Sequence, residues 1–177
     1  LLDEHRDNCL LALAELPRTG QESKFGIAFT NISSGRFVLI EVEGLNNALT
    51  ELERIKPAEI LIQDDRLSLE AALKHPALRK RPPWEFELDN AVRLLTSHFK
   101  TRDLSAFDCE GMNLALQSAG CLLQYARDTQ RSDLPHIQGI QVERLGDSVI
   151  LDAASRRNLE IDSNLSGGRD NTLLSIL

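Results

Sequence analysis

Two adjacent carboxylates, Asp64 and Asp65, are the residues of this sequence whose type and spacing come nearest to metal chemistry. They follow the apolar segment 59–63, which is predicted to be a buried strand. Nucleases that use two divalent ions need several acidic side chains to converge on one point. The apolar run 8–14 supplies no acid, and Asn31, at the end of another predicted strand, is an amide. The pair is therefore interpreted as a solvated turn, and a divalent-metal nuclease is kept as an alternative.

No other residue pattern predicts a catalytic, cofactor or metal site. The histidines lack the HxH or HxxxH spacing of metal ligands: they are His5, His75, His98 and His136. The cysteines are odd in number and form no CxxC motif, so inert thiols in a reducing cytosol are expected: they are Cys9, Cys109 and Cys121. The segment 166–169 lacks the frame of a phosphate-binding loop and is interpreted as a linker.

A cluster of cations in the stretch 74–81 could touch phosphate. The candidates are Lys74, Arg79, Lys80 and Arg81. The whole chain, however, has 20 Lys and Arg against 27 Asp and Glu, a net charge of −7. A protein that grips duplex DNA needs clustered, uncompensated cations. A solvated loop is therefore favoured for this stretch, and an accessory DNA-contacting domain is a further alternative.

The first half of the chain follows an α/β pattern. Segments 24–31 and 36–42 are rich in Phe, Ile and Val and predict two strands of a β-hairpin. A helix over 45–52 leads into the apolar strand 59–63, which suggests a crossover onto the hairpin sheet. The run 8–14 is compatible with a strand or a helix, because a short apolar run does not show periodicity.

The second half predicts longer helices. The alternation of Trp84 to Leu88 indicates a strand, and Asp89 is the expected N-cap of a helix that reaches Phe99. The clearest helix is 112–130, in which Gly120 indicates a closely packed neighbour. Two short strands are expected within 140–151, followed by a helix that Asp152 caps.

Length and composition fit a globular domain with part of a neighbour. The chain has 177 residues, of which 42% are hydrophobic and 27% charged. No apolar run approaches the roughly 18 residues of a membrane span, and no secretory signal pattern begins the sequence. The start without Met suggests a fragment of a larger protein, with a domain boundary near 130–136.

Six stretches in the same order and spacing closely resemble the MutS family of bacterial DNA mismatch-recognition proteins. They are ISSGRF (32–37), RPPWEFEL (81–88), TRDL (101–104), AGCLLQYARDTQ (119–130), LPHI (134–137) and DAASRRNLEI (152–161). The resemblance covers essentially the whole chain. It implies that residues 1–133 are the connector domain, an α/β, RNase H-like mixed sheet flanked by helices, and that 8–14 is a strand. Residues 134–177 would begin the mainly helical core, or lever, domain.

The resemblance also implies a function. The parent would be a cytoplasmic, homodimeric ATPase that binds mismatched duplex DNA and recruits MutL, with no membrane contact. The connector would be non-catalytic, would link the mismatch-reading domain to the core and ATPase domains, and would dock MutL. ATP and Mg²⁺ are expected in the ATPase domain and no cofactor in this chain. The candidate docking residues are Asn90, Arg93, Thr96, Ser97 and Lys100. The expected inter-domain structural residues are Asp152, Arg156 and Arg157.

Overall fold

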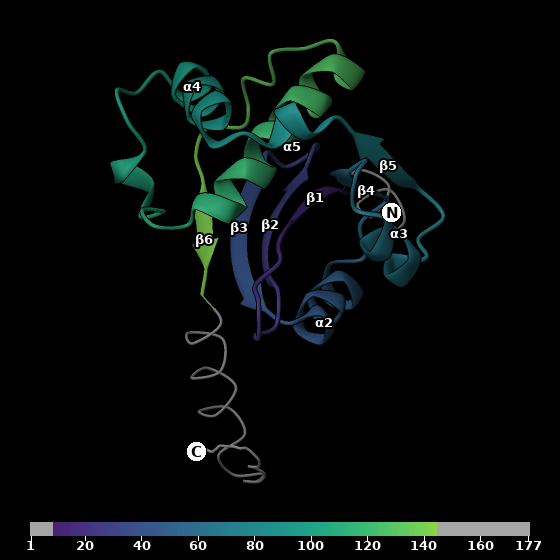
Figure 1. The fold of residues 1–177 in the computed structure, drawn as a ribbon. Coiled ribbons are helices and arrows are strands. Elements are labelled where there is room, and N and C mark those ends of the chain that lie inside the picture. Colours follow the sequence, from purple (N-terminus) through teal and green to yellow (C-terminus); the bar gives the residue numbers. More distant parts are fainter. Residues whose placement is uncertain (1–8, 145–177) are drawn as a thin grey trace, which may run out of the picture. The chain divides into compact units, whose positions relative to one another are not determined.

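A six-stranded mixed sheet forms the centre of the structure, a computed structural model that describes residues 9–144. Its strand order is β5-β4-β1-β2-β3-β6 (Figure 1). The strands are β1 (Cys9–Leu16), β2 (Lys24–Asn31), β3 (Arg36–Glu43), β4 (Glu59–Gln63), β5 (Leu78–Arg81) and β6 (Gln141–Glu143). The α/β class and the mixed sheet flanked by helices are thereby confirmed.

Strands β1, β2 and β3 pair antiparallel along their full lengths, and β4, β5 and β6 extend this meander as parallel neighbours. Residues Cys9–Ala14 of β1 are all buried. A central strand covered on both faces has no polar side to alternate with its apolar side. The run 8–14 therefore showed no periodicity in the sequence, although it is a strand.

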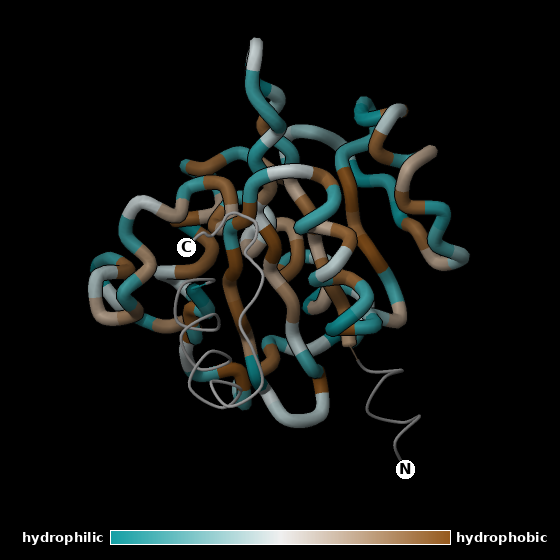
Figure 2. The backbone as a smooth tube through the Cα atoms, turned by 90° about the horizontal axis from the view of Figure 1, so that it is seen from below, coloured by the Kyte–Doolittle hydropathy of each residue, from teal (hydrophilic) through white to brown (hydrophobic). Residues whose placement is uncertain are grey.

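Helices cover both faces of the sheet. They are α2 (Leu45–Ile55), α3 (Leu67–Leu73), α4 (Leu88–Phe99) and α5 (Asn113–Gln130). Side chains of α4 and α5 pack with one face of the strands, and side chains of α2 and α3 pack with the other. Figure 2 shows the hydrophobic stretches of the strands running through the interior between these helices. Consecutive residues of β1 point to opposite faces of the sheet, so Leu10 belongs to one apolar cluster and Leu11 to the other.

Two glycines allow α5 to approach its neighbours closely. A Cβ on Gly26 of β2 would overlap the backbone of α5 at Leu114 and Ala115. A Cβ on Gly120 would lie 2.5 Å from the Cβ of Ala91 in α4. The close packing expected from Gly120 is confirmed. Helices α4 and α5 thus form one tightly packed pair, fixed to the sheet where the Ser118 hydroxyl donates to the Gly26 carbonyl at 2.7 Å.

The strand expected at 84–88 is wrong. Residues Pro83–Phe86 form a 3₁₀ helix, and α4 begins at Leu88 without a side-chain cap from Asp89. Arg81, the last residue of β5, donates to both carboxylate oxygens of Glu85, at 2.9 and 3.0 Å. Glu85 is consequently 6% exposed and Trp84 is 58% exposed, the reverse of what an amphipathic strand would give.

Part of the loop expected at 74–81 is instead the edge strand β5. Residues Leu78–Arg81 pair in parallel with Ile60–Gln63 of β4. Three of the four β5 residues are cationic, so the segment lacks the apolar content that predicts a strand from sequence. Without β5, the N–H and C=O groups on one side of β4 would have no strand to pair with. The pairing with β5 satisfies these backbone groups.

Residues 134–143 pack on the sheet. Leu134, Ile137 and Ile140 are 2%, 2% and 7% exposed, and β6 pairs with Val38–Ile40 of β3. The compact unit ends at Glu143, so its packing continues beyond residue 133. The assignment of the following segment to the core domain stays a prediction, because residues 145–177 lie outside the described part of the chain. Also outside it are Asp152, Arg156, Arg157 and the second of the two short strands expected within 140–151.

Candidate functional site

The predicted docking residues lie on α4, on the side turned away from the core. Ala91 and Leu95 of the same helix are fully buried. Arg93, Ser97 and Lys100 are exposed, and Asn90 and Thr96 are half-buried. The structure therefore brings all five residues together on one helix and its C-cap. We call the five residues Asn90, Arg93, Thr96, Ser97 and Lys100 the α4 face.

The α4 face makes few contacts with the rest of the domain. Arg93 donates to the Asn90 side-chain oxygen at 3.4 Å, and the Thr96 hydroxyl donates to the Val92 carbonyl at 2.8 Å, both within the helix. Lys100 ends the helix in a left-handed conformation, with φ of 58°. Within residues 9–144 neither Arg93 nor Lys100 forms a salt bridge. In the described part of the chain, these two cationic groups thus have no carboxylate partner.

Next to this face, Ser97 and Lys100 line a hollow of about 530 Å³, whose wall includes His98 and Arg127. Arg127 Nη2 lies 3.0 Å from His98 Nδ1, and His98 Nε2 lies 2.9 Å from the Ile137 carbonyl oxygen. Because a guanidinium only donates, Nδ1 accepts and Nε2 bears the hydrogen. Burial, followed by the nearby Arg127 charge, lowers the pKa of His98. The neutral imidazole therefore joins the ends of α4 and α5 to the segment after α5.

The four phosphate candidates lie at the β5 edge of the domain. Three are paired with carboxylates: Arg79 with Glu59 at 3.4 Å, Lys80 with Glu70 at 3.3 Å and Arg81 with Glu85 at 2.9 Å. Lys74, exposed at the end of α3, forms no ion pair within residues 9–144. The positive charge of the stretch is largely compensated by these carboxylates, and phosphate contact there stays a prediction.

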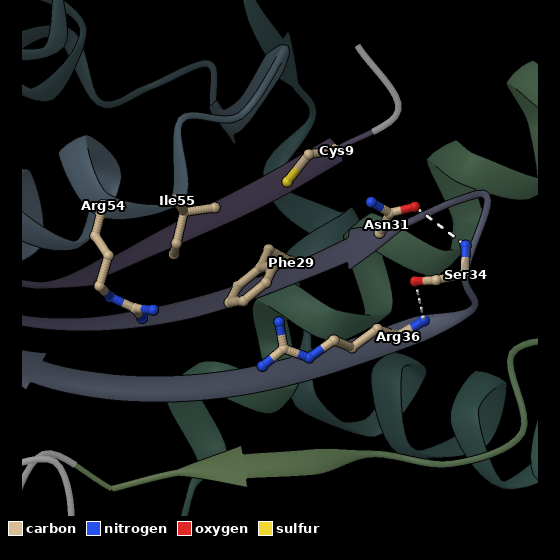
Figure 3. Close-up of a pocket in the computed structure, with 7 residues that line it drawn as sticks. All are labelled: Cys9, Phe29, Asn31, Ser34, Arg36, Arg54 and Ile55. Atoms are coloured by element: carbon tan, nitrogen blue, oxygen red, sulfur yellow. Dashed lines mark hydrogen bonds between the residues drawn. The ribbon is translucent and has the colours of Figure 1, made fainter. Parts of the chain in front are cut away.

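A second hollow, of about 400 Å³, lies on the α2 side of the sheet (Figure 3). It is lined by Cys9, Phe29, Asn31, Ser34, Arg36, Arg54 and Ile55. The Arg36 guanidinium lies over the Phe29 ring, 5.7 Å from its centroid. Burial raises the pKa of the Cys9 thiol to about 11. The hollow therefore presents two guanidiniums and an unreactive thiol.

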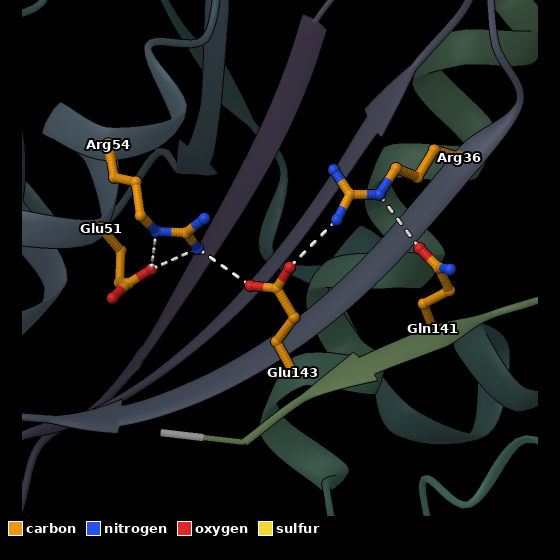
Figure 4. Close-up of polar contacts among 5 residues, drawn as sticks. All are labelled: Arg36, Glu51, Arg54, Gln141 and Glu143. Carbon is orange, nitrogen blue, oxygen red and sulfur yellow. Dashed lines mark hydrogen bonds and ion pairs between the residues drawn. The ribbon is translucent and has the colours of Figure 1, made fainter. Parts of the chain in front are cut away.

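The Glu143 carboxylate bridges the two guanidiniums (Figure 4). Its carboxylate contacts Arg36 of β3 at 3.1 Å and Arg54 of α2 at 2.9 Å. Arg36 also donates to the Gln141 side chain at 3.0 Å, and Arg54 pairs with Glu51 at 2.6 Å. This network fixes the last strand of the unit to β3 and α2. Sequence reasoning missed it, because the pairing of β6 with β3 brings together residues more than a hundred positions apart.

The acidic and thiol candidates do not form a reactive centre. Asp64 and Asp65 are exposed at the end of β4, and no three acidic, histidine or cysteine side chains among residues 9–144 are placed to hold a metal ion. All three cysteines are buried. Desolvation raises the pKa of Cys109 and of Cys121, which makes their thiolates scarce.

The fold and the surfaces define an α/β domain whose prominent features are a polar helix face and an anchored final strand. The family described as MutS domain II matches residues 8–138. The chain therefore belongs to the MutS family, and this domain is the non-catalytic connector of a DNA mismatch repair protein. No helix in the described part of the chain is long and apolar enough to span a membrane.

Proposed function

We propose that this connector docks MutL through the α4 face and links the mismatch-reading domain to the core and ATPase domains of its parent. The parent would be a bacterial, cytoplasmic homodimer that binds mismatched duplex DNA. ATP and Mg²⁺ would be bound by its ATPase domain. The observation that supports docking is the exposure of Arg93 and Lys100 on the outer side of α4 without an internal salt bridge.

The packing of α4 supports a docking role. Ala91 and Gly120 are in such close contact that α4 cannot slide along α5 without a steric clash. The half-buried His98 further holds the C-terminal end of α4 to Arg127 and to the Ile137 carbonyl. A rigid helix loses little conformational freedom when a partner binds, which favours affinity. Cationic rim groups also accelerate encounter with an acidic patch.

The link function is supported by the ion pairs of Glu143, the last residue of the compact unit. Glu143 is held by guanidiniums from two elements, Arg36 of β3 and Arg54 of α2. A force applied to the chain after Glu143 would therefore be shared by the sheet and a helix. In this proposal the connector moves as one body when the parent changes conformation.

The docking test is a titration of the isotope-labelled chain with purified MutL, followed by amide chemical shifts. Saturable shifts on 88–100 are expected. Lys100→Glu should weaken binding about fivefold or more, because one surface charge pair is worth up to about 1 kcal/mol and reversal adds repulsion. Lys56→Glu is the matched control, since Lys56 is also an exposed, left-handed lysine that ends a helix, α2.

The outcomes separate the docking surface from the docking function. Equal losses for Lys56→Glu and Lys100→Glu would attribute the effect to overall charge and reject the α4 face. Shifts confined to other elements would also reject it. If no shifts occur with MutL, the titration is repeated with the full-length dimer bound to mismatched DNA and ATP, and failure there rejects docking by this domain.

A further inference from the structure

Exposed leucines gather at one end of the sheet. Of the four large hydrophobic side chains that are exposed among residues 9–144, three are Leu16, Leu45 and Leu67, at 49%, 36% and 70%. Leu16 ends β1, Leu45 begins α2 directly after β3, and Leu67 begins α3 shortly after β4. These three strands run in the same direction, so their carboxyl ends meet at the same edge. The leucines therefore surround one region, distant in sequence from the α4 face.

A hollow of about 300 Å³ lies at this edge. Its residues are Glu15, Glu22, Ser23, Phe25, Leu45, Ser68, Leu69 and Ala72. Phe25 and Leu69 are buried and belong to the apolar cluster beneath α2 and α3. The floor is thus continuous with the hydrophobic core, whereas two glutamates and two serines contribute the polar part of the lining. Leu16 and Leu67 are the chain neighbours of Glu15 and Ser68.

The charges around this hollow do not cancel. Arg18 is paired with Glu43 at 3.5 Å, and Arg66 approaches Asp65 at 4.0 Å. The contact of Arg66 with Glu15 is to the backbone carbonyl, at 3.5 Å, and not to the carboxylate. Within residues 9–144 the carboxylates of Glu15 and Glu22 therefore form no salt bridge. The hollow combines an apolar floor with two uncompensated negative charges.

We infer that this hollow docks a basic amphipathic segment of a protein partner, which inserts the alkyl stem of a lysine or arginine. The stem of such a side chain packs on apolar surface while its cationic head stays at the polar edge. Here the stem would lie on Phe25 and Leu69, and the head would pair with Glu15 and Glu22. Apolar residues of the same segment would cover Leu16, Leu45 and Leu67. A purely apolar segment would desolvate both carboxylates without compensation, and an acidic one would be repelled.

The test uses the full chain and an amphipathic peptide of about 14 residues, long enough for four helical turns, with leucine on one face and arginine beside it. A second peptide has glutamate in place of arginine. Saturable amide shifts are expected at Ser23, Leu45, Ser68 and Ala72 with the arginine peptide only. The binding should weaken as salt is raised from low to physiological concentration.

Variants of the hollow then assign the contacts. Glu15→Gln and Glu22→Gln should each weaken the arginine peptide several-fold, and Leu67→Ser should do the same by removing exposed apolar surface. The matched controls are Glu87→Gln and Trp84→Ser, because Glu87 is an exposed carboxylate on α4's N-terminal side and Trp84 is the fourth exposed hydrophobic residue. The controls should leave affinity unchanged.

Three results would overturn the inference. The first is no saturable shift at peptide concentrations of about 1 mM, a Kd that corresponds to about −4 kcal/mol. The second is equal binding of the glutamate peptide. The third is a set of shifts away from the hollow. The inference is likewise overturned if the control variants weaken the arginine peptide as much as Glu15→Gln does. None of these results depends on whether MutL docks on the α4 face.

Discussion

The contact between Gly120 and Ala91 allows a quantitative test of how α4 is held. A methyl group added by Gly120→Ala would place its carbon 2.5 Å from the Ala91 Cβ and 2.7 Å from the Ala91 Cα. Non-bonded carbons prefer separations of about 3.5–4.0 Å, so the two helices must separate by more than 1 Å. Overpacking of this kind typically costs about 1–3 kcal/mol. It is partly offset by about 1 kcal/mol of helix propensity.

Because both contacts are shorter than 3 Å, the overpacking cost should lie in the upper part of this range, about 2–3 kcal/mol. After the gain in helix propensity, we therefore expect Gly120→Ala to lower the free energy of unfolding by about 1–2 kcal/mol. The reciprocal change Ala91→Gly should cost about 2 kcal/mol, from lost propensity and one lost buried methyl group. The double variant moves the methyl group from α4 to α5 and removes the 2.5 Å contact, but it keeps the 2.7 Å contact with the Cα of residue 91. It should therefore be more stable than the loss of about 3–4 kcal/mol that simple addition predicts, and less stable than the parent chain.

The assay is urea unfolding of the four chains, monitored by far-UV circular dichroism, with the midpoint and slope fitted separately. An unchanged slope shows that only stability has altered. Losses that add in the double variant would refute the close helix contact. The same four chains, titrated with MutL, show whether displacement of α4 also weakens docking. Gly120→Ala should reduce the affinity, and the double variant should restore part of it.

Four further predictions follow from individual contacts. His98 faces Arg127, Asp133 and His136, and in the folded chain its pKa lies below the ordinary value. The unfolded chain therefore binds more protons, and the free energy of unfolding should fall as pH drops through about 6.5. His98→Gln should reduce this pH dependence in urea melts at pH 7.5 and 5.5. Glu143→Gln should cost about 0.5–1 kcal/mol, since its pairs with Arg36 and Arg54 are partly exposed, and the cost should shrink in 1 M salt; an unaltered urea midpoint at low salt would contradict the network. A chain of residues 1–144 should unfold as cooperatively as the full chain. A chain of residues 1–133 should have a free energy of unfolding lower by about 5 kcal/mol, because Leu134, Ile137 and Ile140 are buried. Equal thermal midpoints of the two chains would show that 134–143 contribute nothing to stability. All three cysteines should resist a thiol reagent at pH 8 until urea unfolds the chain, because each is buried; rapid labelling of the native protein would contradict that burial.

Local sequence determined the elements whose signals are repeated over many residues. The hairpin of 24–31 and 36–42, the strand 59–63 and the helix after Met112 have bounds close to those predicted. Each depends on side-chain periodicity or β-branched and aromatic content, which act over a few neighbouring residues. The exposed side of α4 also follows from local sequence, because Val92, Leu95 and Phe99 recur at helical spacing and mark the side of the helix that packs on the core.

Tertiary structure decided the elements whose residues are stabilised by distant partners. The cationic strand β5 exists because β4 offers it a hydrogen-bonding edge. The segment 83–86 contacts α5: Phe86 lies in the apolar cluster with side chains of α5, and the Cys121 thiol donates to the Glu85 carboxylate at 3.8 Å. Strand β6 and the Glu143 network require β3 and α2, which lie far away in the chain. The hollow beside Leu45 likewise forms only where the ends of β1, β3 and β4 meet. In each case the stabilising contacts join residues that are far apart in the sequence, so no local window contains both partners.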